Sequence, residues 1–361
     1  MKLKRMFAFV MSLLMVFSLA ACGSNGSSSG NSGAGSSGGS GETGVSASDY
    51  SAENPMVLRF AGQSPEQTLV YFAHVGICEK VKEATDGALV IEYYPNNQLG
   101  DYTQVFDELI MGTIDMGCIA PSDNVNPLMN AAQIPALAAT YEGMAEICGE
   151  GGYISNLCIS EIEKLNLVCP GLFFNGMSGI ATVKATTEPA NAAVDKGLIV
   201  RTPALITWQA GIESLGFRTS ALPYSDIFSS IQTGVIDGYG GGMPHTALLA
   251  FSDVISYYYD YNLNAEFLPF MISKKTWDKL PVEWQEIVTN ACKEACAESF
   301  VDVQEYEMGC LEDLTEKGIE VVTFSDEERA AYVEIMREKA WPQLEEIYGE
   351  EFFSNLRANL A

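Results

Sequence analysis

The sequence predicts an α/β fold in which helices cover sheets of largely parallel strands. Two observations lead to this prediction. From residue 56 onward, short apolar runs typical of buried strands alternate with longer amphipathic runs typical of helices. The 361 residues and the 47% hydrophobic content are enough for about two domains, at roughly 150 residues each. In folds of this kind, ligands gather at the carboxyl ends of the strands.

Each expected element has its own residue pattern. Buried apolar runs predict strands at 56–62, 88–95, 113–120, 165–174, 197–201 and 234–241. Helical spacing of apolar residues predicts helices at 67–87 and 101–112. The region 276–317 keeps helical spacing over most of its length, so one long helix or two joined helices should extend past a single small domain. Ser325 stands three residues before Glu328, a capping-box pattern that predicts the start of a last helix.

Charge and composition exclude several classes of function. The net charge is −27, from 20 basic and 47 acidic residues, so the surface should repel nucleic acid phosphates. The two histidines, His74 and His245, are too few for a histidine-rich metal site and disfavour a histidine triad. No spaced metal ligands and no serine or cysteine nucleophile beside a base are visible. We therefore expect no enzyme, no cofactor and no metal ligands of the chain's own; a carboxylate-pair glycosidase is the open enzyme alternative, and assistance of ligand binding by a metal ion stays open.

The N-terminus has the features of an export signal. A basic start is followed by an apolar run at 6–20, which is short for a membrane span of about 20 residues. The run ends in Leu19-Ala20-Ala21-Cys22, which resembles a bacterial lipobox and implies cleavage before Cys22 and lipidation of its sulfur. The alternative is an ordinary signal peptide with an incidental cysteine. We expect a lipoprotein signal peptide at 1–21.

A flexible tether follows the signal peptide. Residues 23–48 are almost entirely Gly, Ser, Ala and Asn, a composition that cannot bury enough apolar surface to fold. We assign 22–54 to the lipidated cysteine and this tether. A lipid and a long tether predict an extracytoplasmic protein anchored to the cell membrane, at a Gram-positive cell surface.

Eight further cysteines follow Cys22 in the chain. An exported protein normally pairs its cysteines. Here they lack regular spacing and most stand in apolar stretches, which favours buried free thiols. The pairing itself stays open, because connectivity does not follow from one sequence.

Arg201 closes the apolar run 197–201 and is the only basic residue between 197 and 217. Thr202 is suited to cap a helix and Pro203 to its first position, so Arg201 should lie where a strand ends and a helix begins. Free N–H groups at a helix start attract an anion, and a guanidinium offers two parallel donors to a carboxylate. The alternative is an ion pair with one of the 47 acidic residues.

A motif of fixed spacing surrounds Arg201. Its members are Lys196, Gly197, Arg201, Leu215, Gly216, Pro223, Tyr224, Ser225, Asp226, Phe228, Gln232, Gly234, Ile236, Asp237 and Gly238. Segments 85–117, 173–176 and 274–288 add a strand with a P-x-x-Q-L-G turn, an F-N-G turn and a K-x-x-W-x-x-L-P stretch. Together they resemble the solute-binding proteins of tripartite ATP-independent periplasmic (TRAP) transporters, of the dicarboxylate-binding (DctP) type. The resemblance covers about residues 55–345.

This resemblance implies a periplasmic-binding-protein-like fold, with two α/β domains, an interdomain ligand cleft and a long domain-spanning helix. Domain I is expected at 55–175 plus about 264–305, and domain II at 176–263 plus about 306–361. The arginine at the place of Arg201 pairs with the substrate's carboxylate in this family. The implied partner is a permease with small and large membrane subunits, and monomer is the default state. A sensor that presents ligand to a receptor kinase would have the same folded domains.

The sequence departs from the family pattern at two places. Ser178 stands where the family often has a second arginine, and Gly240 and Gly241 stand where it has polar residues. These changes predict a monocarboxylate ligand with a bulky or aromatic remainder. A C4-dicarboxylate or a sugar acid is the alternative, and Arg218 or Lys184 would supply the missing cation for a diacid.

The candidate ligand contacts combine the cation, aromatic side chains and polar residues near strand ends. Tyr224 takes the place of a family aromatic residue that packs on the ligand. The three other aromatic candidates have a core role as their alternative, since aromatic side chains near strand ends are usually buried. The complete set is Arg201, Tyr224, Trp208, Tyr239, Phe174, Asn175, Ser178, Gln63, Ser122 and Gly241.

Overall fold

The computed structural model of the chain describes residues 46–138 and 140–360. The predicted signal peptide at 1–21, the lipidation site at Cys22 and most of the tether lie outside the described residues. Within them, no helix is both long and apolar enough to cross a membrane.

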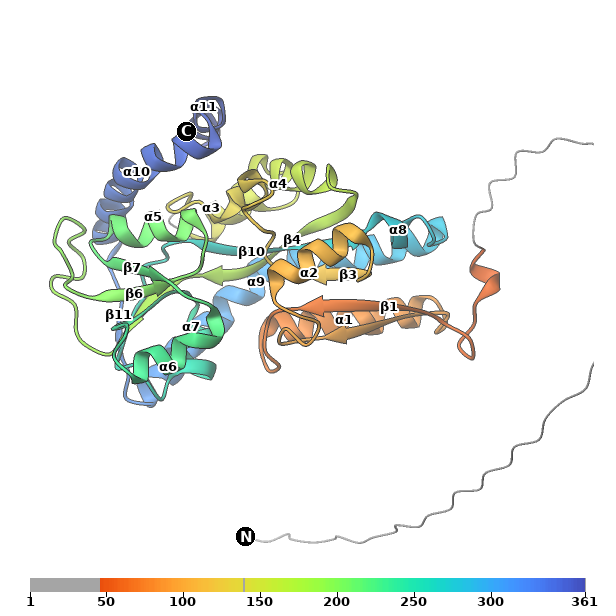
Figure 1. Cartoon of the computed structure of the whole chain (residues 1–361), viewed down its shortest axis with the longest axis horizontal. Coiled ribbons are helices and arrows are strands. Elements are labelled where there is room, and N and C mark those ends of the chain that lie inside the picture. Colours follow the sequence, from red (N-terminus) through yellow and green to blue (C-terminus); the bar gives the residue numbers. More distant parts are fainter. Residues whose placement is uncertain (1–45, 139, 361) are drawn as a thin grey trace, which may run out of the picture. The chain divides into compact units, whose positions relative to one another are not determined.

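The first sheet has five strands in the order β2-β1-β3-β10-β4 (Figure 1). Strands β1, β2 and β3 are parallel to one another, whereas β10 runs antiparallel to both β3 and β4. The strand bounds are β1 Met56–Gly62, β2 Leu89–Tyr94, β3 Met116–Cys118, β4 Leu167–Met177 and β10 Ala265–Ser273.

The second sheet has six strands in the order β11-β9-β5-β8-β6-β7. Here β6 pairs in parallel with β7 and β8, β11 pairs in parallel with β9, and β5 is antiparallel to both of its neighbours. The bounds are β5 Gly179–Thr182, β6 Ile199–Thr202, β7 Arg218–Ala221, β8 Gly238–Gly242, β9 Tyr257–Tyr259 and β11 Glu320–Val322. Both sheets are therefore mixed, and the expectation of largely parallel sheets was too simple.

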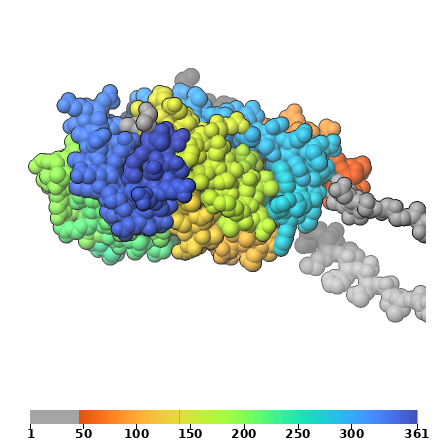
Figure 2. Space-filling view, turned by 90° about the horizontal axis from the view of Figure 1, so that it is seen from above, coloured from red at the N-terminus to blue at the C-terminus, as the bar shows by residue number. Residues whose placement is uncertain are grey.

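Helices cover both sheets and fill the space around them. The α-helices are α1 Leu69–Ala84, α2 Tyr102–Met111, α3 Tyr141–Cys148, α4 Tyr153–Glu163, α5 Ile206–Ser214, α6 Ile227–Gln232, α7 Pro244–Thr246, α8 Lys274–Trp277, α9 Val282–Glu316, α10 Asp326–Tyr348 and α11 Glu350–Asn359. Short 3₁₀ helices form at η1 Ala47–Asp49, η2 Pro127–Gln133 and η3 Tyr224–Asp226, and one π-helical segment forms at η4 Ala247–Phe251. The space-filling view shows α10 and α11, in the darkest blue, beside the yellow-green α4 (Figure 2).

The chain passes between the two sheets three times. It leaves the first sheet at the end of β4 and enters the second at β5, and it returns between β9 and β10. These two crossings are bonded to each other: Ser178 N donates to Asn264 O and Leu263 N donates to Ser178 O, both at 2.9 Å. The third passage is the 35-residue helix α9, which contacts β4 of the first sheet and β11 of the second. The predicted α/β fold class with a long helix is thereby confirmed.

Most predicted elements form close to their expected bounds. The capping box at the start of α10 is present, since Glu328 N donates to Ser325 Oγ and Ser325 N donates to Glu328 Oε2. The prediction at Thr202 was wrong. Thr202 is the last residue of β6, and α5 begins only at Ile206, without a side-chain cap. The strand expected from 234 begins at Gly238, because residues 234–237 form the turn after α6.

The cysteines of the described residues are free thiols, as predicted. Seven of these eight are buried and Cys78 is half-buried. Burial raises the pKa of the Cys78 thiol to about 12, so it stays protonated at neutral pH.

Candidate ligand-binding site

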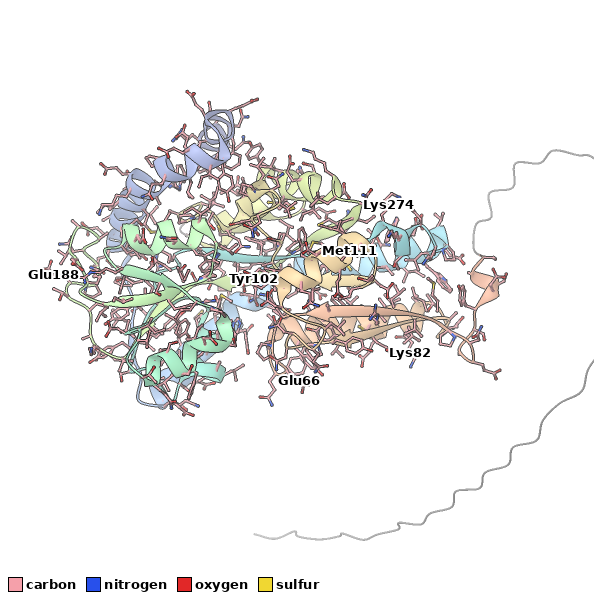
Figure 3. All side chains as sticks on the ribbon, viewed as in Figure 1. Glu66, Lys82, Tyr102, Met111, Glu188 and Lys274 are labelled. Carbon is pink, nitrogen blue, oxygen red and sulfur yellow. The ribbon has the colours of Figure 1, made fainter. Side chains whose placement is uncertain are left out.

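A cavity of about 420 Å³ opens where strand ends of the two sheets meet. The first sheet contributes residues that follow β1, β2 and β3, and the second contributes residues at or after the ends of β6, β7 and β8. Tyr102, at the start of α2, lies in the middle of the molecule between the strands of the two sheets (Figure 3). The cavity thus lies at the carboxyl ends of strands, where α/β folds bind ligands.

Arg201 is the cation of this cavity. Its side chain is 7% exposed, and its Nε donates to the carbonyl oxygen of Leu222 at 2.9 Å. Within residues 46–138 and 140–360, no hydrogen bond or ion pair uses its two terminal nitrogens. Burial lowers the pKa of Arg201 to about 10, which leaves the guanidinium charged at neutral pH. The ion pair with an acidic residue, the alternative weighed from the sequence, is not formed with any residue that the structure describes.

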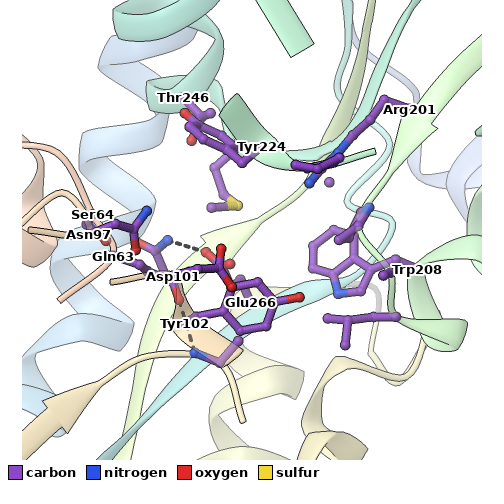
Figure 4. Close-up of a pocket in the computed structure, with 18 of the residues that line it drawn as sticks. Gln63, Ser64, Asn97, Asp101, Tyr102, Arg201, Trp208, Tyr224, Thr246 and Glu266 are labelled. Carbon is purple, nitrogen blue, oxygen red and sulfur yellow. Dashed lines mark hydrogen bonds between the residues drawn. The ribbon is translucent and has the colours of Figure 1, made fainter. Parts of the chain in front are cut away.

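An aromatic wall stands beside Arg201, on α5 and on the short helix η3 (Figure 4). Trp208 is 2% exposed and its Nε1 donates to Gln133 Oε1 at 2.7 Å, which fixes the indole plane. Gly241 lies against the same ring, since a Cβ built there meets Trp208 Cε3 at 3.1 Å. Tyr224 is 44% exposed and packs edge-on against Phe251, with ring centroids 5.6 Å apart.

Polar side chains form the wall contributed by the first sheet. Gln63 Oε1 accepts from Ala120 N at 3.0 Å and so joins the loops after β1 and β3. Asn175 donates its side-chain amide to Glu266 Oε2. Burial raises the pKa of the Glu266 carboxyl, while the bond from Asn175 and the charge of Arg201 oppose that rise.

Six of the ten predicted contacts line the cavity: Arg201, Tyr224, Trp208, Asn175, Gln63 and Gly241. The other four do not. Phe174 neighbours Asn175 on β4 but points to the opposite side, where it stacks on Phe300 with centroids 5.1 Å apart, as strand alternation requires. Tyr239 is 1% exposed and packs on Phe251.

Ser178 and Ser122 are buried away from the cavity. Ser178 is fully enclosed, and its hydroxyl accepts from Asn264 N at 3.3 Å. Ser122 is 8% exposed, and its carbonyl oxygen accepts from Val125 N in a turn. Ser178 thus belongs to the crossing between the sheets and offers nothing to a ligand.

Both cations considered as replacements for a second arginine have partners elsewhere. Arg218 pairs with Asp195 and Lys184 pairs with Asp237, each at 2.9 Å, and neither lines the cavity. Gly240, one of the two glycines at polar positions of the family pattern, is tightly enclosed by its neighbours. A Cβ built at Gly240 meets Ile212 Cδ1 at 2.6 Å, so this glycine permits close packing of β8 on α5.

Several cavity residues were missed by the sequence reasoning. Asn97, Asp101 and Tyr102 follow β2 in the same way as Gln63 follows β1, so the rule about strand ends was enough to find them. Glu266 had no such signal, because it lies on β10, an antiparallel strand within the sheet. His245 and Thr246 belong to the three-residue helix α7, which was not predicted.

Two sheets joined by crossing strands, with a cavity between their strand ends, define a solute-binding protein of the periplasmic-binding type. The chain matches the family described as bacterial extracellular solute-binding protein, family 7 (DctP), over residues 60–347. It belongs to this family, whose members are solute-binding proteins for transport and not enzymes.

Known relatives agree with this assignment. The C4-dicarboxylate-binding periplasmic protein DctP of Rhodobacter capsulatus is 23% identical over 297 residues, which cover 78% of this chain and 84% of that protein. A TRAP periplasmic solute-binding protein from Sulfitobacter with bound β-D-galacturonate superposes with a TM-score of 0.74, at 22% identity over 84% of this chain and 99% of that chain. One from Desulfovibrio salexigens with bound orotic acid gives a TM-score of 0.74, at 19% identity over 84% and 98%.

Proposed function

We propose that the chain is the extracytoplasmic receptor of a TRAP transporter and binds a small organic acid through a pair between Arg201 and the ligand's carboxylate. The observation that carries the proposal is the buried guanidinium of Arg201, whose terminal nitrogens have no partner among the described residues and face the cavity. A buried charge without a partner is unfavourable, and a carboxylate matches its two parallel donors. The site therefore favours an anionic group at this wall.

The ligand that we propose has one carboxylate and a bulky or aromatic remainder. Among residues 46–138 and 140–360, Arg201 is the one lysine or arginine that lines the cavity, and Trp208 and Tyr224 supply flat apolar surface. The orotic acid bound by the Desulfovibrio salexigens protein is an example of such a ligand in a relative. The C4-dicarboxylate and the galacturonate of other relatives stay the alternative classes.

The proposal includes the chain's location and partners. We propose lipidation at Cys22, a tether at 22–54, anchoring at a Gram-positive cell surface, a monomeric state, and delivery of ligand to a permease with small and large membrane subunits. Domain I at 55–175 plus about 264–305 and domain II at 176–263 plus about 306–361 are part of it. The switch of the chain between the two sheets near residues 177–179 and 259–265 supports these boundaries. Neighbouring genes for both membrane subunits would favour transport over sensing.

The test is a thermal-shift screen of the purified protein against C4-diacids, sugar acids, 2-oxo acids, branched-chain acids and aromatic acids. A ligand at about 100 times its Kd stabilises by about 2.7 kcal/mol, which a melting curve resolves. We expect Arg201→Ala to lower the affinity for the best-binding acid by about 100-fold or more, because the substitution removes a buried ionic hydrogen-bond pair.

The matched control is Arg218→Ala, which removes an exposed arginine outside the cavity and should leave affinity unchanged. Equal affinity of Arg201→Ala and the unmodified protein would contradict the proposal. A diacid as the best ligand would leave the receptor function standing but overturn the monocarboxylate assignment.

A further inference from the structure

The charges that line the cavity do not suit a simple anion. Arg201 is opposed by two carboxylates, Glu266 and Asp101. His245 adds no charge at neutral pH, because burial lowers its pKa to about 4. The charged groups around the cavity therefore sum to about one negative charge when both carboxylates are ionised, and each further negative charge on the ligand is repelled.

The carboxylate of Glu266 has one oxygen without a hydrogen-bond donor among the described residues. It lies on β10, and one of its oxygens accepts the side-chain amide of Asn175. Its other oxygen has no hydrogen-bond partner, and no lysine, arginine or histidine of the described chain lies within ion-pair distance of the carboxylate. That oxygen is not one of the enclosed polar atoms without a partner, so it is open to the cavity.

Asp101 also lines the cavity, but its carboxylate caps a helix. It is the N-cap of α2, and its Oδ1 accepts from Thr103 N at 3.1 Å and from Thr103 Oγ1 at 2.9 Å. Asp101 is exposed, so its carboxylate does not depend on a ligand for its remaining hydrogen bonds. Its charge adds to the negative potential near Glu266 without requiring a ligand group of its own.

The aromatic lining is compatible with a positive group as well as with an apolar one. Tyr102, Tyr224 and Trp208 line the same cavity, and aromatic faces attract cations. Figure 4 shows Arg201 and Glu266 on different walls of the cavity, with Tyr102 beside Glu266 and Trp208 below Arg201. The cavity therefore offers a cation at one wall, an acid at another, and aromatic surface near both.

We infer that the ligand is a zwitterion, an amino acid in the broad sense, whose carboxylate pairs with Arg201 and whose ammonium group donates to Glu266. This inference rests on the proposed function, because it uses the same cavity and the same pair at Arg201. An ammonium group supplies the hydrogen-bond donor that Glu266 lacks. Because a zwitterion has no net charge, its binding leaves the total charge of the cavity unchanged. Burial raises the pKa of Glu266 in the empty cavity, and an ammonium group beside the carboxylate would oppose that rise.

The experiment compares matched acids that differ only by an amine. The probes are L-phenylalanine against 3-phenylpropanoate, 4-aminobutanoate against butanoate, and 5-aminopentanoate against pentanoate, titrated calorimetrically into the purified protein. The three pairs place the nitrogen at increasing distance from the carboxylate. We expect the amino member of at least one pair to bind roughly tenfold or more tightly, as an ionic hydrogen bond in a cavity allows.

Two variants separate the inference from the proposed function. Glu266→Gln keeps the oxygen that accepts from Asn175 but removes the charge, so it should abolish the preference for the amine and leave the amine-free acid bound as well or better. Arg201→Ala should weaken the binding of both acids in each pair. Glu298→Gln, an exposed acid on α9 outside the cavity, is the matched control and should change nothing.

Other results would overturn the inference. Tighter binding of the amine-free member in every pair would overturn the zwitterion while the receptor of organic acids stands. Binding of simple acids that requires added Na⁺ or Ca²⁺ would mean that a metal ion takes the place given to the ammonium. No binding of any organic acid, amino or not, would overturn the proposed function and the inference together.

Discussion

Trp208 is positioned from two sides, and both constraints act on single atoms. Its indole nitrogen donates to Gln133, and its six-membered ring lies against Gly241. Gly241 has φ of +84°, in the left-handed region, and a Cβ there also meets Pro203 Cδ at 3.1 Å. The glycine therefore serves both the backbone conformation and the close approach of the ring.

We expect Gly241→Ala to destabilise the protein and to weaken ligand binding by displacing Trp208. Gly234→Ala is the matched control, because Gly234 has φ of +71° but open space around its Cβ position. Both variants carry the strain of a positive φ, which is about 1 kcal/mol. The crowding should add about 1–2 kcal/mol to Gly241→Ala alone. Urea unfolding of both variants measures the difference, and equal losses would contradict the role assigned to the ring contact.

The place of Arg201 in the cavity could be predicted from the sequence, whereas that of Glu266 could not. Arg201 is a lone cation in an apolar run, within a motif of fixed spacing, so its place at a strand end could be predicted. Glu266 is one of 47 acidic residues. Its place in the cavity depends on β10 being inserted between β3 and β4, a pairing between segments about 100 to 150 residues apart in the chain. Local patterns carry no information about such a pairing.

Helix α9 contains a buried acidic residue, Glu307. Glu307 is 2% exposed, accepts from Met177 N at 3.3 Å and accepts the hydroxyl of Tyr141. Burial raises the pKa of this carboxyl well above its ordinary value of 4.5, against the opposing effect of these two hydrogen bonds. The folded chain therefore holds a proton that the unfolded chain releases as pH rises.

The sign of the resulting pH dependence follows directly. The stability gained from the neutral carboxyl is fully present below pH 4.5 and declines as pH rises from there toward the raised folded pKa. Glu307→Gln cannot ionise and keeps an oxygen for both donors. We expect its free energy of unfolding, relative to the unmodified protein, to rise steadily between about pH 4 and pH 8.

The measurement is urea unfolding across that pH range, with Glu298→Gln as the exposed control on the same helix. A difference between Glu307→Gln and the unmodified protein that stays constant with pH would show that Glu307 does not take up a proton on folding.

The helices show where local signals are sufficient and where they are not. The long region around α9 and the capping box of α10 were predicted because each depends on residues close in sequence. The start of α5 was predicted too early because Thr202 pairs with Ala221 of β7 and therefore belongs to a strand. Its local preference for a helix cap is overridden by this pairing. Tertiary pairing decided the boundary.

At the scale of the whole molecule, the cavity and the crossings between the sheets belong together. Ser178 and Asn264 bond the two crossing segments to each other, and α9 passes beside both sheets. The cavity takes Gln63 and Glu266 from the first sheet and Arg201 and Tyr224 from the second. A ligand that contacts both sets is a further connection between the sheets and favours the arrangement in which both contacts are made.

This coupling predicts a pattern of backbone protection that a one-sided ligand cannot produce. We expect the acid with the largest thermal shift to slow amide hydrogen exchange at Gln63 and Ser64, after β1, and at Leu222 and Tyr224, after β7, because a shared ligand must be released before either loop opens. Exchange in α11, which contributes nothing to the cavity, is the internal control. In Arg201→Ala the protection should vanish from both loops together, since the ligand loses its anchor on the second sheet. Protection that persists at Gln63 and Ser64 in that variant would mean that the first sheet binds the ligand alone, which would contradict a ligand held by both sheets.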